Sequence, residues 1–184
     1  MGFEVKIITF LQSGANDVWT AFFKTVSLFG DWVGMVIVFA LFLFLVGRKY
    51  AFTFLFTYIS GFAVGHIIKA IVERDRPYQT FGEIQGLSTV FGSSMPSGHA
   101  ISSIIIAIFA VFLVYKLTKN KFFRIAMTVT MAMFVFIVCL SRMYLGLHYL
   151  TDILAGLSIG AIVSTIGLFI FNRSFRKTKE VKDD

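Results

Sequence analysis

The sequence contains little charge. Charged residues make up 15% of its 184 residues, against about 25% in an ordinary soluble domain. Hydrophobic residues make up 57%, phenylalanine alone occurs 23 times, and the mean hydropathy is +0.82. A soluble fold of this size could not bury so much apolar surface, because a small domain keeps a large share of its atoms exposed. We therefore expect lipid to cover part of the chain.

Cysteine is scarcer still. The single one, Cys139, lies in an apolar run and is interpreted as a packing residue, and an internal disulfide is excluded. The sequence also contains no internal repeat and no low-complexity segment. Its first residues do not resemble a signal peptide, because the polar segment 12–17 interrupts a short apolar stretch. We expect the first long apolar run to be retained.

The net charge of +7 would suggest nucleic-acid binding in a soluble protein. Here the basic residues gather between apolar runs, which is typical of a membrane protein and excludes a nucleic-acid partner. Five apolar runs approach the roughly 20 residues that a bilayer-spanning helix needs. These runs are 28–47, 50–72, 98–117, 122–141 and 150–172.

The pattern predicts an all-α fold, a polytopic transmembrane helical bundle of about five to six spans. Residues 1–172 would form a single membrane-embedded domain, followed by a charged tail, 173–184, that we expect to be disordered. Residues 3–11 and 17–29 are predicted to be short helices. In the second, Trp19, Phe22 and Val26 recur at three- and four-residue steps, which favours a helix in the membrane interface. The alternative for residues 1–30 is a poor first span.

Basic residues also predict the orientation. Eleven of the 17 Lys and Arg lie in the segments 48–49, 116–124 and 173–182, which share one side of the predicted bundle. The positive-inside rule places this side, with the C-terminus, in the cytoplasm of a cell-membrane protein. The loop 73–97 and the connection 142–149 then lie together at the outer face.

The first polar cluster is at the end of the second predicted span. Lys69 and Arg76 are seven residues apart, two helical turns, so both can point the same way. Pro77 should end the helix near Arg76. A cation deep in a span costs about 2.5–3.5 kcal/mol on insertion scales, which an anionic ligand would offset. Snorkelling of Lys69, or pairing with Glu73 or Asp75, is the alternative.

The second cluster is Pro96-Ser97-Gly98-His99, at the start of a long apolar helix. The free N–H groups and positive dipole end of a helix N-terminus attract anions. Ser97 can cap the helix and donate its hydroxyl, and Gly98 lets a ligand approach the backbone. An ordinary helix cap would account for both residues but not for His99, a titratable ring in an otherwise apolar helix.

The third cluster contains Arg142, His148 and Asp152. Because His148 and Asp152 are one helical turn apart, the carboxylate can accept the ring N–H and leave the other ring nitrogen as a nucleophile. Arg142 offers a planar fork suited to phosphate oxygens. A purely structural His–Asp pair at a helix start is the alternative.

All three clusters map to one membrane face. Together they contain three basic residues, two histidines, a carboxylate and a helix N-terminus. Phosphoryl transfer uses these groups, since fixed cations and N–H groups stabilise charge on the equatorial oxygens. A nucleophile divides the displacement into two steps, and a second imidazole can protonate the leaving oxygen.

With these three clusters, the sequence resembles the type 2 phosphatidate phosphatase superfamily, the lipid phosphate phosphatases. Its three-part signature matches Lys69 to Pro77, Pro96 to His99, and Ser141 to Asp152, in order and without a departure. The superfamily also includes soluble vanadate-dependent haloperoxidases, from which the hydropathy of this chain separates it. The flanking apolar segments fit the membrane-embedded branch.

The resemblance implies a role for each matching residue. His148 would form a phosphohistidine, Asp152 would orient it, and His99 would be the general acid. The phosphate would be bound by Lys69, Arg76, Ser97, Gly98 and Arg142. The family works without a metal or other cofactor, which agrees with the absence of clustered carboxylates in this sequence.

The expected substrate is a membrane lipid with its phosphate or diphosphate at the outer face, and undecaprenyl diphosphate in a bacterial cell is the first candidate. Phosphatidylglycerol phosphate, phosphatidate and a lipid A phosphate are the alternatives. A non-enzymatic lipid or anion transporter could use the same basic pocket, but it has no need of a His148–Asp152 pair opposite His99.

Residues beside the clusters receive ordinary interpretations. His66 is interpreted as a core or supporting histidine, and the segment 73–75 as a solvated charge cluster. The tyrosines at 78, 144 and 149 are interpreted as interfacial anchors.

Overall fold

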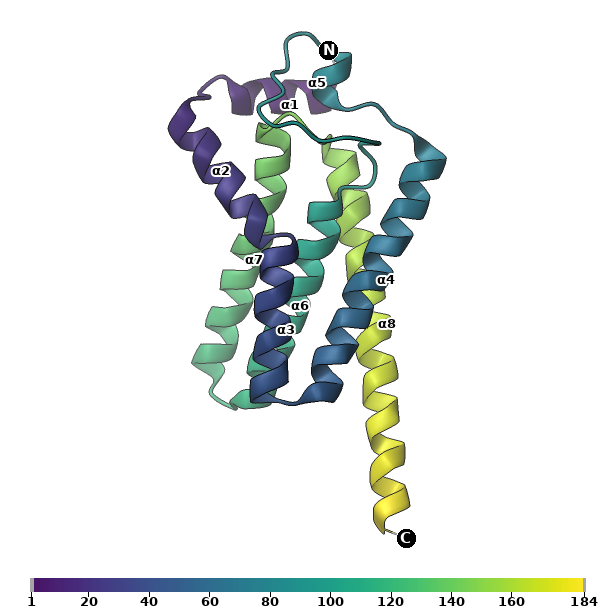
Figure 1. Cartoon of the computed structure of the whole chain (residues 1–184). Coiled ribbons are helices and arrows are strands. Elements are labelled where there is room, and N and C mark those ends of the chain that lie inside the picture. The colour runs from purple at the N-terminus through teal and green to yellow at the C-terminus, as the bar shows by residue number, and fades with distance from the viewer. Residues whose placement is uncertain (1, 184) are drawn as a thin grey trace.

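The computed structural model describes residues 2–183, and the side chains of residues 2–170. Within this part of the chain every regular element is a helix, which confirms the all-α expectation. The eight helices are α1 (Phe3–Gln12), α2 (Asp17–Phe29), α3 (Trp32–Leu45), α4 (Arg48–Val72), α5 (Pro77–Thr80), α6 (Gly98–Leu117), α7 (Lys121–Tyr144) and α8 (Leu150–Asp183). The long helices run side by side, and α1, α5 and the α5–α6 loop lie together at one end (Figure 1).

Four helices, α4, α6, α7 and α8, are long and apolar enough to cross a membrane. Helices α2 and α3 meet at a bend of 40° and satisfy the same criterion as a pair, so the described residues contain up to five spans. This agrees with the lower end of the prediction. The run predicted as 28–47 is broken at Gly30-Asp31. Its first residues belong to the end of α2, and the rest forms α3. Such a pair is a broken span or a re-entrant loop, so an interfacial helix and a poor first span both remain predictions for α2.

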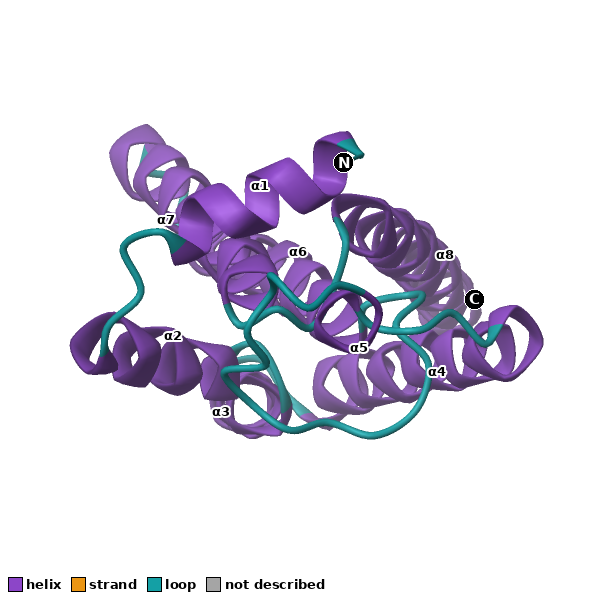
Figure 2. Ribbon diagram, turned by 90° about the horizontal axis from the view of Figure 1, so that it is seen from above, coloured by secondary structure: helices purple, strands orange, loops and turns teal. Residues whose placement is uncertain are grey.

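Helix α1 lies across the end of the bundle, above α6 and α7 when viewed from that end (Figure 2). Its buried face, Val5 and Ile8, packs in the same apolar cluster as Cys139 of α7. Gln12 is the last residue of this helix, and its side-chain Nε2 donates to the carbonyls of Gln85 and Tyr144, at 2.8 Å each. These contacts fix the N-terminal helix to the α5–α6 loop and to the last residue of α7. Cys139 is buried, as its interpretation as a packing residue predicts.

Helix α6 is at the centre of the bundle and supplies much of its core. Two glycines of α8, Gly156 and Gly160, lie directly against it. A Cβ atom at Gly160 would be 2.7 Å from the carbonyl oxygen of Ile101, and one at Gly156 would be 2.6 Å from that of Ser97. Small residues let spanning helices approach closely, where van der Waals contact rather than hydrophobic burial drives association. The pair therefore fixes the position of the start of α8 against the start of α6.

The C-terminal end differs from expectation. Instead of ending near residue 172 in a disordered tail, α8 continues as a helix to Asp183. The segment 173–183 contains no glycine or proline and is rich in lysine and arginine, which are good helix formers. The charge of this segment therefore did not indicate an absence of secondary structure.

Candidate active site

The predicted polar residues converge at the end of the bundle that carries α1 and α5. A cavity of about 220 Å³ opens there between α4, α6 and the connection from α7 to α8. Six of the eight predicted site residues line it, namely Lys69, Arg76, Gly98, His99, Arg142 and His148. A larger groove of about 730 Å³ lies between α4 and α8 around Arg48 and Lys49, and its lining contains no histidine or carboxylate. The smaller cavity is the one with the groups needed for catalysis.

The ring of His148 is held in one tautomer. Its Nδ1 atom lies 2.8 Å from the carbonyl oxygen of Ser94. Because a carbonyl can only accept, Nδ1 carries the proton, and Nε2 of the neutral ring keeps its lone pair. Burial lowers the pKa of His148 from 6.5 to about 4, so the ring is neutral at physiological pH. A buried neutral imidazole is the nucleophilic form.

Asp152 does not bind His148 directly, which corrects the predicted contact. Its Oδ2 atom is 3.7 Å from His148 Nδ1, beyond hydrogen-bond distance. This oxygen accepts instead from the Ser94 hydroxyl and, at 2.8 Å, from the Tyr149 N–H. Asp152 therefore acts on the ring through Ser94, whose side chain binds the carboxylate while its carbonyl binds the imidazole. The spacing of four residues gave no sign of this intermediary, because Ser94 lies in a distant loop.

Within the described chain, Arg142 is the basic residue of the cavity that has a buried N–H group left free to bind an anion. It comes from the last turn of α7 and is buried at the cavity. One terminal nitrogen donates to the Ser27 hydroxyl at 3.1 Å, while Nε has no hydrogen-bond partner among the described residues. A buried guanidinium with an unsatisfied N–H is costly unless a ligand completes it. The phosphate contact of Arg142 stays a prediction.

Lys69 and Arg76 line the cavity, but backbone carbonyls occupy most of their donors. Lys69 Nζ donates to Ser93 at 2.6 Å. Arg76 is buried and donates to the carbonyls of Gly92 and Leu147, at 3.0 Å each. The two cations thus hold the loop before α6 against the α7–α8 connection. Their predicted phosphate contacts remain predictions, and holding this loop is a role that their spacing did not suggest.

The start of α6 presents free backbone donors, since first-turn N–H groups have no intrahelical partner. Ser97 is the N-cap residue, but its side chain makes no cap hydrogen bond, contrary to prediction. Its hydroxyl is buried and has no partner within the described chain. His99 lines the cavity, and its Nε2 atom lies 3.8 Å from Oδ2 of Asp31 in the α2–α3 break. Asp31 also lines the cavity and was not predicted from the sequence.

A family model matches residues 50–176 of the chain, which is more than half of it, and describes the PAP2 superfamily. The chain belongs to the PAP2 superfamily. The resemblance of its three motifs is thereby confirmed, as is its assignment to a family of phosphatases.

Curated relatives carry the names of lipid phosphatases. The chain is 30% identical over 183 residues to the lipid A 4'-phosphatase of Porphyromonas gingivalis, covering 91% of this chain and 71% of the relative. It is 29% identical over 107 residues to the dolichyldiphosphatase of Saccharomyces cerevisiae, covering 57% of this chain and 45% of the relative. With phosphatidylglycerophosphatase B of Bacillus subtilis the identity is 30% over 98 residues, covering 53% and 46%. The chain thus spans less than half the length of the last two.

Solved structures share the PAP2 fold. A transmembrane PAP2 type phosphatidylglycerolphosphate phosphatase from Bacillus subtilis superposes with a TM-score of 0.80 at 21% identity, over 92% of this chain and 85% of that one. LpxE of Aquifex aeolicus gives 0.75 at 18% identity, over 91% and 96%. This PAP2 protein is accordingly an integral membrane protein with the fold of those phosphatases.

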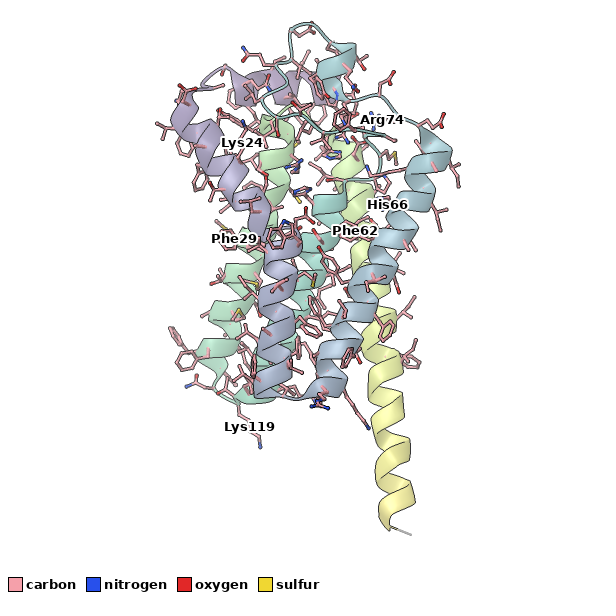
Figure 3. The ribbon with its side chains drawn as sticks, in the orientation of Figure 1. Lys24, Phe29, Phe62, His66, Arg74 and Lys119 are labelled. Carbon is pink, nitrogen blue, oxygen red and sulfur yellow. The ribbon has the colours of Figure 1, made fainter. Side chains whose placement is uncertain are left out.

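Two interpretations of neighbouring residues were wrong, and a third is narrowed to one of its alternatives. His66 is exposed, lines the cavity and bonds through Nδ1 to the Phe62 carbonyl at 2.9 Å (Figure 3), which excludes the core histidine and leaves the supporting one. Tyr144 and Tyr149 are buried rather than interfacial. In the predicted solvated charge cluster 73–75, Glu73 and Asp75 are exposed as expected, but Arg74 is half-buried and bonds to Asp152 at 2.6 Å. Local charge density could not reveal these contacts, because each partner except Phe62 is far along the chain.

Proposed function

We propose that this PAP2 protein hydrolyses the phosphate ester or diphosphate of a membrane lipid through a phosphohistidine on His148. The observation that carries the proposal is the hydrogen bond from Nδ1 to Ser94, which leaves Nε2 as the free nitrogen of a cavity-lining ring. The incompletely bonded guanidinium of Arg142 lines the same cavity. A fixed nucleophile beside a fixed cation is what phosphoryl transfer requires.

The reaction proceeds in two displacements. Nε2 of His148 attacks phosphorus, the P–O bond to the lipid breaks, and the departing oxygen takes a proton from His99. Water then attacks the phosphohistidine, gives a proton to His99, and inorganic phosphate leaves as the His148 ring is released. Oδ2 of Asp31 lies 3.8 Å from Nε2 of His99 in this cavity. Arg142, Lys69, Arg76 and the α6 N-terminus stabilise charge on the phosphoryl oxygens.

The cavity suits a head group alone. Its volume of about 220 Å³ holds a phosphate or diphosphate, while the hydrocarbon tails stay in the bilayer beside the apolar helices. Undecaprenyl diphosphate is the proposed substrate, supported by the name of the yeast dolichyldiphosphatase, a relative with a polyprenyl diphosphate in its name. Phosphatidylglycerol phosphate, phosphatidate and lipid A phosphate are the competing substrates.

Phosphate release from purified lipid phosphates in detergent micelles tests the function. The wild type is expected to release phosphate in the presence of EDTA, millimolar vanadate should inhibit it, and His148→Ala should abolish it. Turnover on a panel of the four lipids ranks the substrates. An inert wild type across the whole panel would contradict the proposal and favour a lipid or anion transporter.

We further propose that the cavity faces away from the cytoplasm in the cell membrane and that the C-terminus is cytoplasmic. The end of the bundle opposite the cavity carries the basic residues of the α3–α4 and α6–α7 turns, together with the C-terminal end of α8 (Figure 1). The positive-inside rule supports this orientation.

A further inference from the structure

Arg74 connects the polar residues behind the cavity. It lies between α4 and α5, at the end of the bundle that holds the site (Figure 3). One terminal nitrogen is 2.6 Å from Oδ1 of Asp152 and 2.7 Å from the Thr151 hydroxyl. The guanidinium carbon is 3.9 Å from the centre of the Tyr149 ring. Arg74 is not among the residues that line the cavity, so these contacts place it behind the nucleophile.

Glu4, in the first turn of α1, holds Arg74 from the other side. Its Oε2 atom is 3.3 Å from the second terminal nitrogen of Arg74. Its Oε1 atom accepts from the N–H of Thr151 at 2.7 Å and from the Thr151 hydroxyl at 2.9 Å. Thr151 is in the first turn of α8, where N–H groups lack intrahelical partners. The N-terminal helix therefore caps the helix that carries Asp152.

Asp152 depends on this support because its side chain is fully buried. Among the described residues, Arg74 is the basic residue that forms an ion pair with Asp152. Removing one partner of such a pair leaves an uncompensated buried charge, which the surroundings accommodate only by rearranging. Ser94 would move first, since its hydroxyl binds Asp152 and its carbonyl holds His148.

We propose that Arg74 is a positioning residue for the His148 nucleophile, held by Glu4, so that α1 is a functional part of the site. The inference rests on the proposed phosphatase function. Because Arg74 acts through Asp152 and Ser94 and does not reach the cavity, its loss affects the alignment of Nε2 and not the binding of the phosphate. Misplacement of a reacting group by a small distance costs up to about 100-fold in rate.

The experiment compares Arg74→Gln, Arg74→Lys and Glu4→Gln in steady-state assays. Arg74→Gln should lower kcat by about tenfold or more with KM within about twofold. Arg74→Lys should fall between it and the wild type, because one ammonium can pair with Asp152 but cannot bridge to Glu4. Glu4→Gln should lower kcat by about threefold, and this effect should disappear in the Arg74→Gln background. Matched controls are Lys24→Gln and Glu83→Gln, which change exposed residues at the same end.

Two outcomes overturn the inference. A raised KM with unchanged kcat in Arg74→Gln would make Arg74 a head-group ligand, and equal rates in all variants would show that the contact has no catalytic consequence.

A second measurement does not depend on turnover. The ¹⁵N signal of the His148 ring should move in Arg74→Gln and stay in place in Lys24→Gln. If the signal moves although the wild type releases no phosphate, the proposed function fails and the positioning contact stands. If the wild type is active, His148→Ala is inactive, and Arg74→Gln changes neither rate nor signal, the inference alone fails.

Discussion

At the scale of the residue, the buried polar groups of the site differ in whether they have a hydrogen-bond partner within the protein. Of the groups around the nucleophile, some are bonded to other residues, such as Nδ1 of His148, and others are not, such as the Ser97 hydroxyl and Nε of Arg142. Bonded groups fix the geometry, and unbonded ones favour a ligand, since a buried polar atom without a partner costs about 1–3 kcal/mol. The two kinds call for different tests.

The tautomer and charge of His148 can be measured directly. Because burial lowers its pKa to about 4, the ring should stay neutral down to that pH, whereas a free imidazole is half protonated at about 6.5. Protonation of Nε2 removes the nucleophile, so the loss of activity from this group should occur below pH 6.5 and closer to 4. ¹⁵N spectra of ligand-free protein should show the proton on Nδ1. A titration midpoint near 6.5, or a proton on Nε2, would contradict the geometry.

Ser97→Ala separates ligand binding from stability. The hydroxyl has no partner in the described chain, so its removal should leave the melting temperature unchanged or slightly raised. If the hydroxyl contacts the phosphate, KM or the inhibition constant of vanadate should rise by up to about tenfold, the worth of one hydrogen bond. Ser103→Ala, which removes a bonded hydroxyl of the same helix, is the control. A marked fall in melting temperature with unchanged KM would make Ser97 structural.

At the scale of the element, hydropathy located the spanning helices but not the contacts between them. The residues of α4, α6, α7 and α8 form long apolar runs. These runs alone predict the bounds of the first three helices and the start of α8 to within a few residues, but not the end of α8. The motif positions of Lys69, His99 and His148 correctly predicted which helix ends meet. Asp31, in the break between α2 and α3, lines the cavity but was not predicted from the sequence. Ser94 and Arg74 could not be predicted, because their roles depend on partners 58 and 78 residues away.

The close approach of α8 to α6 should not tolerate a side chain at Gly160. A Cβ there would collide with the Ile104 side chain and with the Ile101 carbonyl at 2.7 Å. Gly160→Val should therefore lower stability by about 1–3 kcal/mol, the usual cost of overpacking, and lower kcat because the start of α8 carries Asp152. Thermal unfolding in detergent measures the first effect. Gly82→Ala, with nothing within 4 Å of its Cβ, is the control, and equal melting temperatures for both variants would contradict tight packing.

At the scale of the whole molecule, the bundle has two chemically different ends. The cavity, α1 and the loop before α6 lie at one end, while Lys119 marks the opposite one (Figure 3). If the positive-inside rule holds, the two ends face different compartments. A lipid phosphatase of this design then acts on head groups of one leaflet only.

Cysteine labelling tests this orientation. The single native Cys139 is buried and should give little background. A membrane-impermeant maleimide should label Glu83→Cys in intact cells and Lys119→Cys only after permeabilisation. Both replaced residues are exposed, so accessibility alone does not distinguish them. The reverse pattern would place the cavity in the cytoplasm.

The position of α1 has a practical consequence for anyone who purifies or images this enzyme. This helix, Phe3–Gln12, lies across the catalytic end and is anchored there through Glu4 and Gln12. An affinity tag or fluorescent fusion placed before α1 would lie against the catalytic end, whereas one placed beyond α8 would lie far from it, since α8 runs to the opposite end of the bundle (Figure 1). Loss of turnover caused by an N-terminal fusion alone would be a sign of this geometry and not of a misfolded preparation.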